Sequence, residues 1–142
     1  MSITAEREPI THRLTFEAYL AELVARLAKF TTWRVANEQD FQPGDSLWLQ
    51  VRQGDEKRVF GSAEIVEVRD ATFGTLNPED FVGHEPFASH EELVQTYKRY
   101  YGAEVNDETP ITVIQFQTRV VANRPNDLDE TDVIVFSGQV TA

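Results

Sequence analysis

The sequence predicts an α+β protein, and three observations lead to that fold class. Two segments carry apolar residues at the three- and four-residue steps of an amphipathic helix. Other segments are rich in β-branched and aromatic residues, and one alternates between apolar and polar positions. Clusters of Pro, Gly, Asn and Asp separate these segments as turns. The expected order is one helix, three strands, two helices and two strands.

The composition is that of one globular domain. The chain has 142 residues, of which 41% are hydrophobic, so we expect a single domain over residues 1–142, with its core at residues 14–121 and a C-terminal extension at residues 122–142. No stretch approaches the roughly 20 apolar residues of a membrane helix, and the first nine residues do not resemble a signal peptide. We therefore expect a soluble, cytoplasmic protein that does not contact membranes.

The first helix is expected at residues 14–29, where an apolar stripe recurs with helical spacing. Thr15 is a candidate cap, and Glu17 in the first turn would suit the positive end of the helix dipole. At residues 30–35 the sequence changes to side chains that favour β-structure. This change predicts that a strand follows the helix directly.

A hairpin is expected next. Residues 46–51 alternate, with Trp48 on the side opposite to the apolar positions, which predicts a half-buried strand. The turn QGDE precedes a long return strand at residues 59–68, in which Gly61 indicates a bulge. Antiparallel pairing of the two strands follows.

The second half of the chain predicts two helices and two strands. A short helix begins after Asn77, and a capping box at Ser89 opens a second long helix that Gly102 ends. Residues 111–121 contain the β-branched and apolar side chains of a central strand, and residues 133–140 predict a last strand.

The sequence carries no familiar catalytic or metal-binding motif. It has no phosphate-binding glycine loop, no HExxH and no GxSxG, and without cysteine it has no disulfide, thiol nucleophile or thiolate zinc site. The acidic loop at residues 123–132 lacks the turn glycine and distant glutamate of a calcium loop, so we expect a solvated loop. His84 and His90 flank Glu85, and we expect them to have surface or loop-packing roles. No metal or cofactor is predicted.

Polar residues interrupt an apolar neighbourhood where the first helix gives way to a strand. Thr32 and Arg34 are two residues apart, so they share one face of that strand, while Trp33 packs behind or beside them. Lys29 lies at the junction and can reach either side. From spacing alone, an ordinary strand surface, with Lys29 solvating the end of the helix, is favoured over a site, and Trp33 and Trp48 are favoured as core or cleft-wall residues over base-stacking ones.

At these residues the chain resembles the ASCH family, whose members have a PUA-like barrel and a Gly-x-Lys-x-x-Thr-x-Arg motif after the first helix. Residues 27–34 read LAKFTTWR, and the likeness continues through FQPGD at 41–45, AEIVEV at 63–68 and HEPFAS at 84–89. It spans residues 14–120 in the family's element order. The resemblance implies a small mixed, mainly antiparallel β-barrel with helices packed around it.

The resemblance also implies a function. Related bacterial enzymes hydrolyse N4-acetylcytidine, and the motif Lys, the motif Thr and a later Glu correspond here to Lys29, Thr32 and Glu85 as candidate catalytic residues. Arg34 and Trp33 become candidate substrate-binding residues. A threonine attacks an amide only if a base removes its proton, and Lys29 could be that base if burial and the charge of Arg34 lower its pKa. A variant in which Glu85 activates water, with Thr32 and Lys29 holding the carbonyl oxygen, is equally open.

Two departures from the family bear on this transfer. Leu27 stands where the motif has glycine, which would let the helix run closer to Lys29 and aim it differently. The loop around Glu85 differs in length, and the strand expected at residues 133–140 extends beyond the usual end of the short enzymes.

Three functions therefore stay open. The first is an amidohydrolase of an acylated nucleoside such as N4-acetylcytidine. The second is a module that binds RNA or a modified nucleotide without catalysis, with a small nucleoside or nucleotide, or a short single-stranded RNA, as the partner. The formal charge of −11 argues against long duplex nucleic acid. The third is a regulatory domain whose cleft has lost its chemistry, which a sealed cleft would favour.

Overall fold

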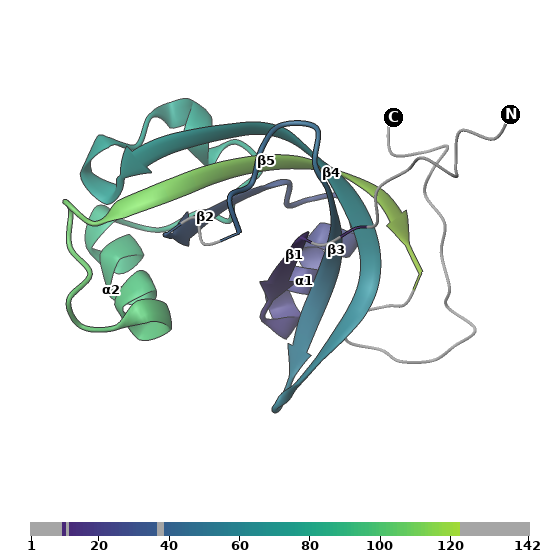
Figure 1. Ribbon diagram of the computed structural model, residues 1–142. Helices are drawn as coiled ribbons and strands as arrows, with labels where there is room; N and C mark the ends of the chain where they lie inside the picture. The colour runs from purple at the N-terminus through teal and green to yellow at the C-terminus, as the bar shows by residue number, and fades with distance from the viewer. Residues whose placement is uncertain (1–9, 11, 37–38, 123–142) are drawn as a thin grey trace, which may run out of the picture.

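A computed structural model of the protein describes residues 10, 12–36 and 39–122. The chain order in it is β1 (His12–Phe16), α1 (Ala18–Ala25), β2 (Thr31–Val35), β3 (Ser46–Gln53), β4 (Glu56–Thr72), the short 3-10 helices η2 (Phe73–Thr75) and η3 (Pro78–Phe81), α2 (His90–Tyr101) and β5 (Pro110–Val121). The five strands form one curled sheet in the order β1-β3-β4-β5-β2. β4 and β5 arch over both helices, which lie on the concave side (Figure 1).

The α+β fold class is confirmed, as a half-barrel rather than a closed one. β1 pairs with β3 in parallel, and the other neighbouring strands are antiparallel, so the sheet is mixed and mainly antiparallel. Among the described residues the two edge strands, β1 and β2, do not pair with one another. The curled sheet therefore has an open side, and this is where the helices lie.

The prediction of a helix over residues 14–29 is wrong at its beginning. Leu14 and Phe16 belong to β1, where side chains two residues apart face the same side, and both are buried against the sheet. Because Phe16 also stands four residues before Leu20, the spacing imitated a helix. Thr15 does not cap α1: its hydroxyl donates to Oε1 of Gln50 across the sheet, 2.9 Å away.

The same prediction is wrong at the end of the helix. α1 stops at Ala25, and Leu27 adopts the left-handed conformation with a φ of 64°. The backbone N–H groups of Ala28 and Lys29 turn back to donate to the carbonyl of Leu23, at 2.9 and 3.2 Å. The helix does not run closer to Lys29; the leucine makes the turn that glycine makes at lower steric cost.

The central hairpin is confirmed. β3 buries Leu47, Leu49 and Val51 and leaves Trp48 on the outer side, and β4 returns antiparallel over a longer range than expected. Gly61 lies beside the predicted irregularity in pairing. A Cβ atom there would lie 2.2 Å from the carbonyl oxygen of Val120, so only glycine permits this close approach of β5.

The capping signals of the second half are also confirmed. Ser89 Oγ accepts a hydrogen bond from the Glu92 backbone N–H at 3.0 Å, and α2 ends at Gly102. The short helix after Asn77 is the 3-10 helix η3, and β5 lies inside the sheet between β4 and β2. The strand expected at residues 133–140 and the acidic loop at residues 123–132 lie outside the described residues.

Two groups of buried apolar side chains divide the molecule. We call the first the sheet core; it joins β1, α1, β3 and β4 and includes Phe16, Leu20, Leu49 and Phe60. We call the second the tryptophan cluster; it comprises Trp33, Phe73, Leu93, Tyr97, Val105, Ile111 and Val113. No helix in the described part of the chain has the length and apolar character needed to cross a membrane.

Candidate functional site

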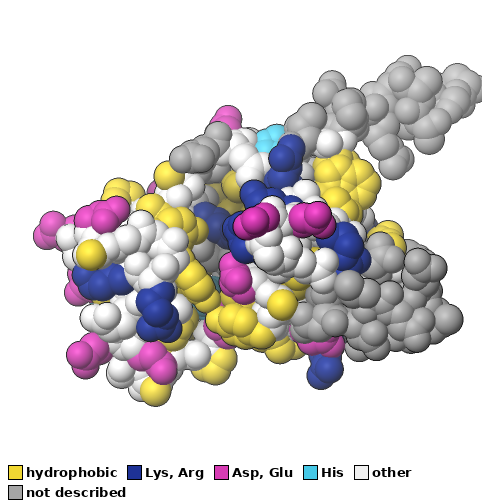
Figure 2. Space-filling view, turned by 90° about the horizontal axis from the view of Figure 1, so that it is seen from below, with side chains coloured by type: hydrophobic (Ala, Val, Ile, Leu, Met, Phe, Trp, Pro, Cys, Tyr) yellow, Lys and Arg dark blue, Asp and Glu magenta, His cyan; other side chains and the backbone are white. Residues whose placement is uncertain are grey.

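A pocket of about 180 Å³ lies where the sheet core meets the tryptophan cluster. Its wall takes Phe16 and Leu20 from the first group and Trp33 and Tyr97 from the second. The volume is below the roughly 300–1,000 Å³ of pockets for drug-sized ligands, so the pocket can enclose only a part of a ligand as large as a nucleotide. Figure 2 looks at the molecule from below, where basic side chains gather near the middle between two lobes.

Lys29 and Glu85 meet inside this pocket, although 56 residues separate them. Lys29 Nζ donates to Oε1 of Glu85 at 2.6 Å and to the backbone carbonyl of Thr31 at 2.7 Å. The lysine side chain is 2% exposed and the glutamate 13%. The structure thus places two of the sequence-predicted catalytic residues in one buried ion pair.

Backbone contacts explain why the two residues converge. The carbonyl of Gly83 accepts from the N–H groups of Phe30 and Thr31, at 2.9 and 3.1 Å, so the loop before Glu85 lies against the start of β2. Gly83 has a φ of 80°, and a Cβ atom there would lie 2.5 Å from the ring of Phe30. Glycine at this position therefore allows the loop to bring the carboxylate to Lys29.

Burial sets the charge state of the pair. Desolvation lowers the pKa of Lys29 to about 8 against the attraction of Glu85, and Arg34 pushes it further down. Burial alone would raise the pKa of Glu85, yet the charge of Lys29, together with His84 and the hydrogen bonds to the carboxylate, outweighs that effect and holds the pKa below its usual value. Near neutral pH the carboxylate is ionised, and Lys29 is a cation that loses its proton readily.

Thr32 and Arg34 share one face of β2, as their spacing predicts, and both line the pocket. Arg34 Nε donates to Thr32 Oγ1 at 3.2 Å, and Nη2 donates to the Thr15 carbonyl at 3.0 Å. The guanidinium carbon lies 5.0 Å from the centre of the Phe16 ring, a cation–π contact. The hydroxyl of Thr32 is therefore held next to a fixed positive charge.

Trp33 forms the wall behind these residues. Its indole is 1% exposed, stacks on the imidazole of His84 with ring centres 3.7 Å apart, and donates from Nε1 to the Asp80 carbonyl at 3.1 Å. With both a stacked ring and a hydrogen bond, it shapes the pocket from the inside. Its assignment as a substrate-binding residue stays a prediction.

His84 packs within the loop, as expected, but its burial and contacts are more specific than the sequence indicates. Nδ1 lies 2.9 Å from the backbone oxygen of Glu85, and since a carbonyl only accepts, Nδ1 carries the proton. Nε2 then accepts from the hydroxyl of Tyr97, 3.1 Å away. Burial lowers the pKa of His84 to about 4, with Lys29 acting in the same direction, so the imidazole is neutral. His90, by contrast, is exposed and pairs with Asp107.

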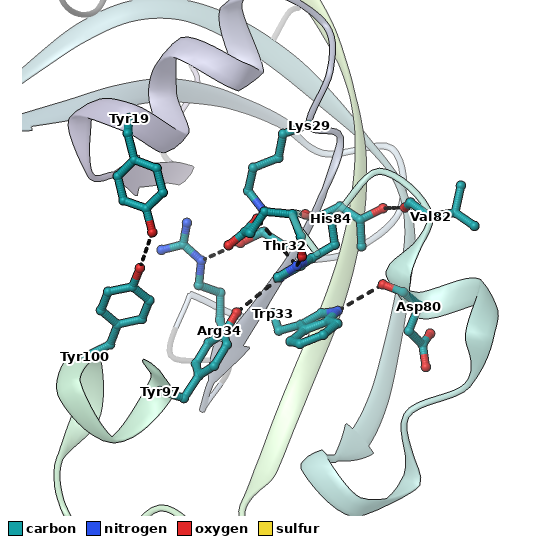
Figure 3. A network of polar contacts seen from close by, with 12 residues as sticks. Tyr19, Lys29, Thr32, Trp33, Arg34, Asp80, Val82, His84, Tyr97 and Tyr100 are labelled. Atoms are coloured by element: carbon teal, nitrogen blue, oxygen red, sulfur yellow. Dashed lines mark hydrogen bonds and ion pairs between the residues drawn. The ribbon is translucent and has the colours of Figure 1, made fainter. Parts of the chain in front are cut away.

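Aromatic residues that the sequence analysis did not connect with the site form its rim. Tyr97, Tyr100 and Tyr101 of α2 line the pocket, and the hydroxyl of Tyr100 lies 2.8 Å from that of Tyr19 on α1. Figure 3 shows the two hydroxyls facing one another across the space between α1 and α2. The sequence could have indicated this rim, since it has three tyrosines within residues 97–101. A helix face that only packs into a core seldom needs three hydroxyl groups.

The cleft is open rather than sealed, and it shows no metal-binding arrangement. Among residues 10, 12–36 and 39–122, no group of three His, Asp or Glu side chains converges as a metal site. The acidic side chains within residues 123–132 are outside this range. The chemistry available in the described pocket is therefore that of an ammonium, a carboxylate, a hydroxyl and a guanidinium.

Comparison with known proteins identifies the fold. By sequence, no protein-family model and no curated protein matches the chain. By structure, it is similar to an ASCH domain from Lactobacillus crispatus (15% identity, TM-score 0.56, 83% of this chain and 86% of that one) and to an ASCH protein from Zymomonas mobilis (13%, 0.57, 83% and 73%). It is also similar to an Enterococcus faecalis protein from a domain family of unknown function (13%, 0.60, 81% and 84%). The curled sheet, the two helices and these similarities together show that the chain has the ASCH-domain fold.

Proposed function

We propose that the protein is an amidohydrolase that removes the acyl group from an acylated nucleoside such as N4-acetylcytidine. The observation that carries the proposal is the contact between Lys29 and Glu85 in a pocket that Thr32 also lines. A buried lysine whose pKa falls to about 8 is suited to proton transfer, because an effective acid or base has a pKa near the working pH. Perturbed titratable groups in a cleft are typical of such sites.

In the proposed reaction, Thr32 Oγ1 attacks the carbonyl carbon of the substrate amide, and neutral Lys29 accepts the hydroxyl proton. Arg34, whose guanidinium donates to Thr32 Oγ1, would stabilise the negative charge that develops on the carbonyl oxygen of the substrate. Collapse of the tetrahedral intermediate breaks the C–N bond, and the proton passes from Lys29 to the leaving amine. Water then attacks the threonine ester while Glu85 accepts its proton. The ester C–O bond breaks as Glu85 returns that proton to Thr32 Oγ1, which releases the acid and restores the hydroxyl.

A second route uses the same residues without a covalent intermediate. Glu85, ionised near neutral pH, removes a proton from water, which attacks the carbonyl directly. Lys29 then acts as an ammonium that holds the carbonyl oxygen together with the Thr32 hydroxyl. The two routes require opposite charge states of Lys29, so the pH dependence of the rate separates them.

The activity is tested by incubating the purified protein with N4-acetylcytidine and measuring cytidine and acetate by mass spectrometry. Thr32→Val replaces the hydroxyl by a methyl group of similar size, and we expect it to lower the rate about 10³-fold or more in the covalent route. Thr32→Ser keeps a hydroxyl and is the matched control. Release of no cytidine by the unaltered protein, or equal release by Thr32→Val, would contradict the proposal.

A binding module for RNA or a modified nucleotide is the second candidate. The observation that favours it is the group of tyrosines at the edge of the pocket, which we call the tyrosine rim: Tyr19, Tyr97, Tyr100 and Tyr101. Tyr19, Tyr100 and Tyr101 are exposed, and exposed aromatic rings can stack on unpaired bases. Fluorescence titration with a short single-stranded RNA at two salt concentrations tests it. Saturable binding that weakens with salt supports a reader, whereas no binding at low salt rejects it.

A further inference from the structure

We propose that the pocket takes a ligand that bears a phosphate group, a nucleoside monophosphate rather than a neutral nucleoside, and that Arg34 is the seat of the phosphate. The inference deepens the proposed function and rests on it for the identity of the base.

The pocket lining holds one more cation than it holds carboxylates. Lys29, Arg34 and Arg52 stand against Glu17 and Glu85. Lys29 is paired with Glu85, and Arg52 Nε is paired with Glu17 at 3.1 Å. Arg34 remains, and among the described residues no carboxylate pairs with it. An excess cation at this position is notable in a chain whose formal charge is −11.

The guanidinium of Arg34 also has donors to spare. Two of its five N–H groups are used, one on Thr32 Oγ1 and one on the Thr15 carbonyl. Nη1 meets no acceptor among the described residues. No buried side-chain nitrogen or oxygen in that part of the chain lacks a hydrogen-bond partner, so Nη1 keeps some exposed surface, and Arg34 is a lining residue of this pocket. A phosphate oxygen there would accept from a donor that is otherwise unsatisfied.

The same group is fixed in place before any ligand arrives. Its two hydrogen bonds and the contact with the Phe16 ring hold the planar guanidinium from three sides. A charge without a paired carboxylate inside a pocket costs free energy. Because burial disfavours the charged form, it lowers the pKa of Arg34. An anion relieves that cost, and a guanidinium matches phosphate because it offers parallel N–H groups.

The tyrosine rim and the overall charge select the size of the ligand. The base would enter beside Tyr97 and Tyr100, and the phosphate would lie on Arg34 with Arg52 at the rim. A net charge of −11 repels a chain of many phosphates, whereas a single phosphate needs only the local excess of one cation. We therefore infer a mononucleotide rather than a polynucleotide.

The test compares the affinities of cytidine, its 5′- and 3′-monophosphates and a short single-stranded RNA by isothermal titration calorimetry. Hydrogen bonds to charged groups are worth more than neutral ones, so we expect one monophosphate to bind about 10- to 100-fold more tightly than cytidine. The advantage should shrink at high salt. Equal binding of nucleoside and monophosphates, no binding of any of them, or tighter binding of the RNA would overturn the inference.

Variants at Arg34 locate the phosphate. Arg34→Gln should reduce the affinity ratio of monophosphate to cytidine to about one, and Arg34→Lys should keep a part of it because the charge remains. Arg119→Gln changes the net charge equally at an exposed position outside the pocket and should leave the ratio unchanged. The ratio is informative even if Arg34→Gln loosens the pocket, since general loosening weakens both ligands alike. An unchanged ratio in Arg34→Gln would show that the phosphate, if bound, lies elsewhere, and would refute the assignment.

These ligands carry no acyl group, so the outcome is independent of hydrolysis. If N4-acetylcytidine is not hydrolysed while the monophosphate preference and its dependence on Arg34 hold, the proposed reaction fails and the ligand class stands. If hydrolysis proceeds while cytidine and its monophosphates bind equally, the reaction stands and the ligand class fails.

Discussion

The sheet core and the tryptophan cluster bury side chains for different purposes. The sheet core is a set of apolar residues held between α1 and the strands, and it has the composition expected of a stabilising core. The buried side chains of Lys29, Asp80 and His84 lie on the other side, around β2 and the loop that holds Glu85, and the buried Tyr97 belongs to the tryptophan cluster. The difference indicates that one half of the described molecule is an apolar core, whereas the other half also buries ionisable groups.

The largest expected effect comes from the sheet core. Phe60 is fully buried, so Phe60→Ala removes a large apolar side chain and should lower the free energy of unfolding by about 3–5 kcal/mol. Chemical denaturation measures this. At temperatures where the variant is still folded, ligand affinity should match that of the unaltered protein; a loss of affinity in the folded variant would show that the two halves are not separate.

Next comes the buried pair. Lys29→Met leaves the Glu85 carboxylate without its partner, and Glu85→Gln leaves the ammonium without its counter-ion; each change should cost about 2–3 kcal/mol, since unpaired buried charge is expensive. The double variant should cost much less than the sum, because no charge is left uncompensated. Denaturant unfolding of all four proteins provides the cycle. Additive losses would mean that the two charges do not depend on one another.

The pH dependence of hydrolysis probes the same pair. If neutral Lys29 is the base, the rate rises about tenfold per pH unit and levels off above pH about 8, the pKa of Lys29. A rate that falls above this pH would instead favour water activation by Glu85. Stability should also change with pH. The folded protein releases this proton at about pH 8 and the unfolded chain near the ordinary lysine pKa of 10.5, so Lys29 makes the protein more stable as pH rises across that interval.

The smallest effect is expected at the junction between the two halves. Leu27 holds a φ of 64°, a conformation that costs a leucine about 1–2 kcal/mol, so Leu27→Gly should raise the free energy of unfolding by about 0.5–1 kcal/mol after the loss of side-chain contacts and chain entropy. Thermal unfolding shows the sign. Leu27→Ala keeps the strain and serves as control; if glycine destabilises as much as alanine, packing of the leucine matters more than its backbone.

Local patterns predicted most of the fold. The alternation in β3 and the cap at Ser89 each depend on neighbours in the chain, so the sequence displays them directly. β1 was missed because its identity comes from parallel pairing with β3, more than 30 residues away, as in the pair Leu14 and Leu49. Five residues with two apolar positions do not distinguish a strand from the first turn of the following helix.

The candidate site divides in the same way. The shared face of Thr32 and Arg34 follows from strand periodicity, but nothing in spacing could join Lys29 to Glu85, and only the family resemblance connected them. Both long helices were predicted, but spacing within each one could not show that Tyr100 of α2 meets Tyr19 of α1. Contacts between distant segments require the curl of the sheet, which depends on pairings and on close approaches such as that at Gly61.

The stacking of Trp33 on His84 gives the protein a built-in optical reporter. The chain contains two tryptophans, and the other, Trp48, is 40% exposed on β3 and does not line the pocket. An enclosed indole emits at shorter wavelengths than a hydrated one. The short-wavelength part of the emission spectrum therefore comes from Trp33 in the wall of the cleft. Binding of a ligand in the pocket can then be followed by this emission without attaching a dye.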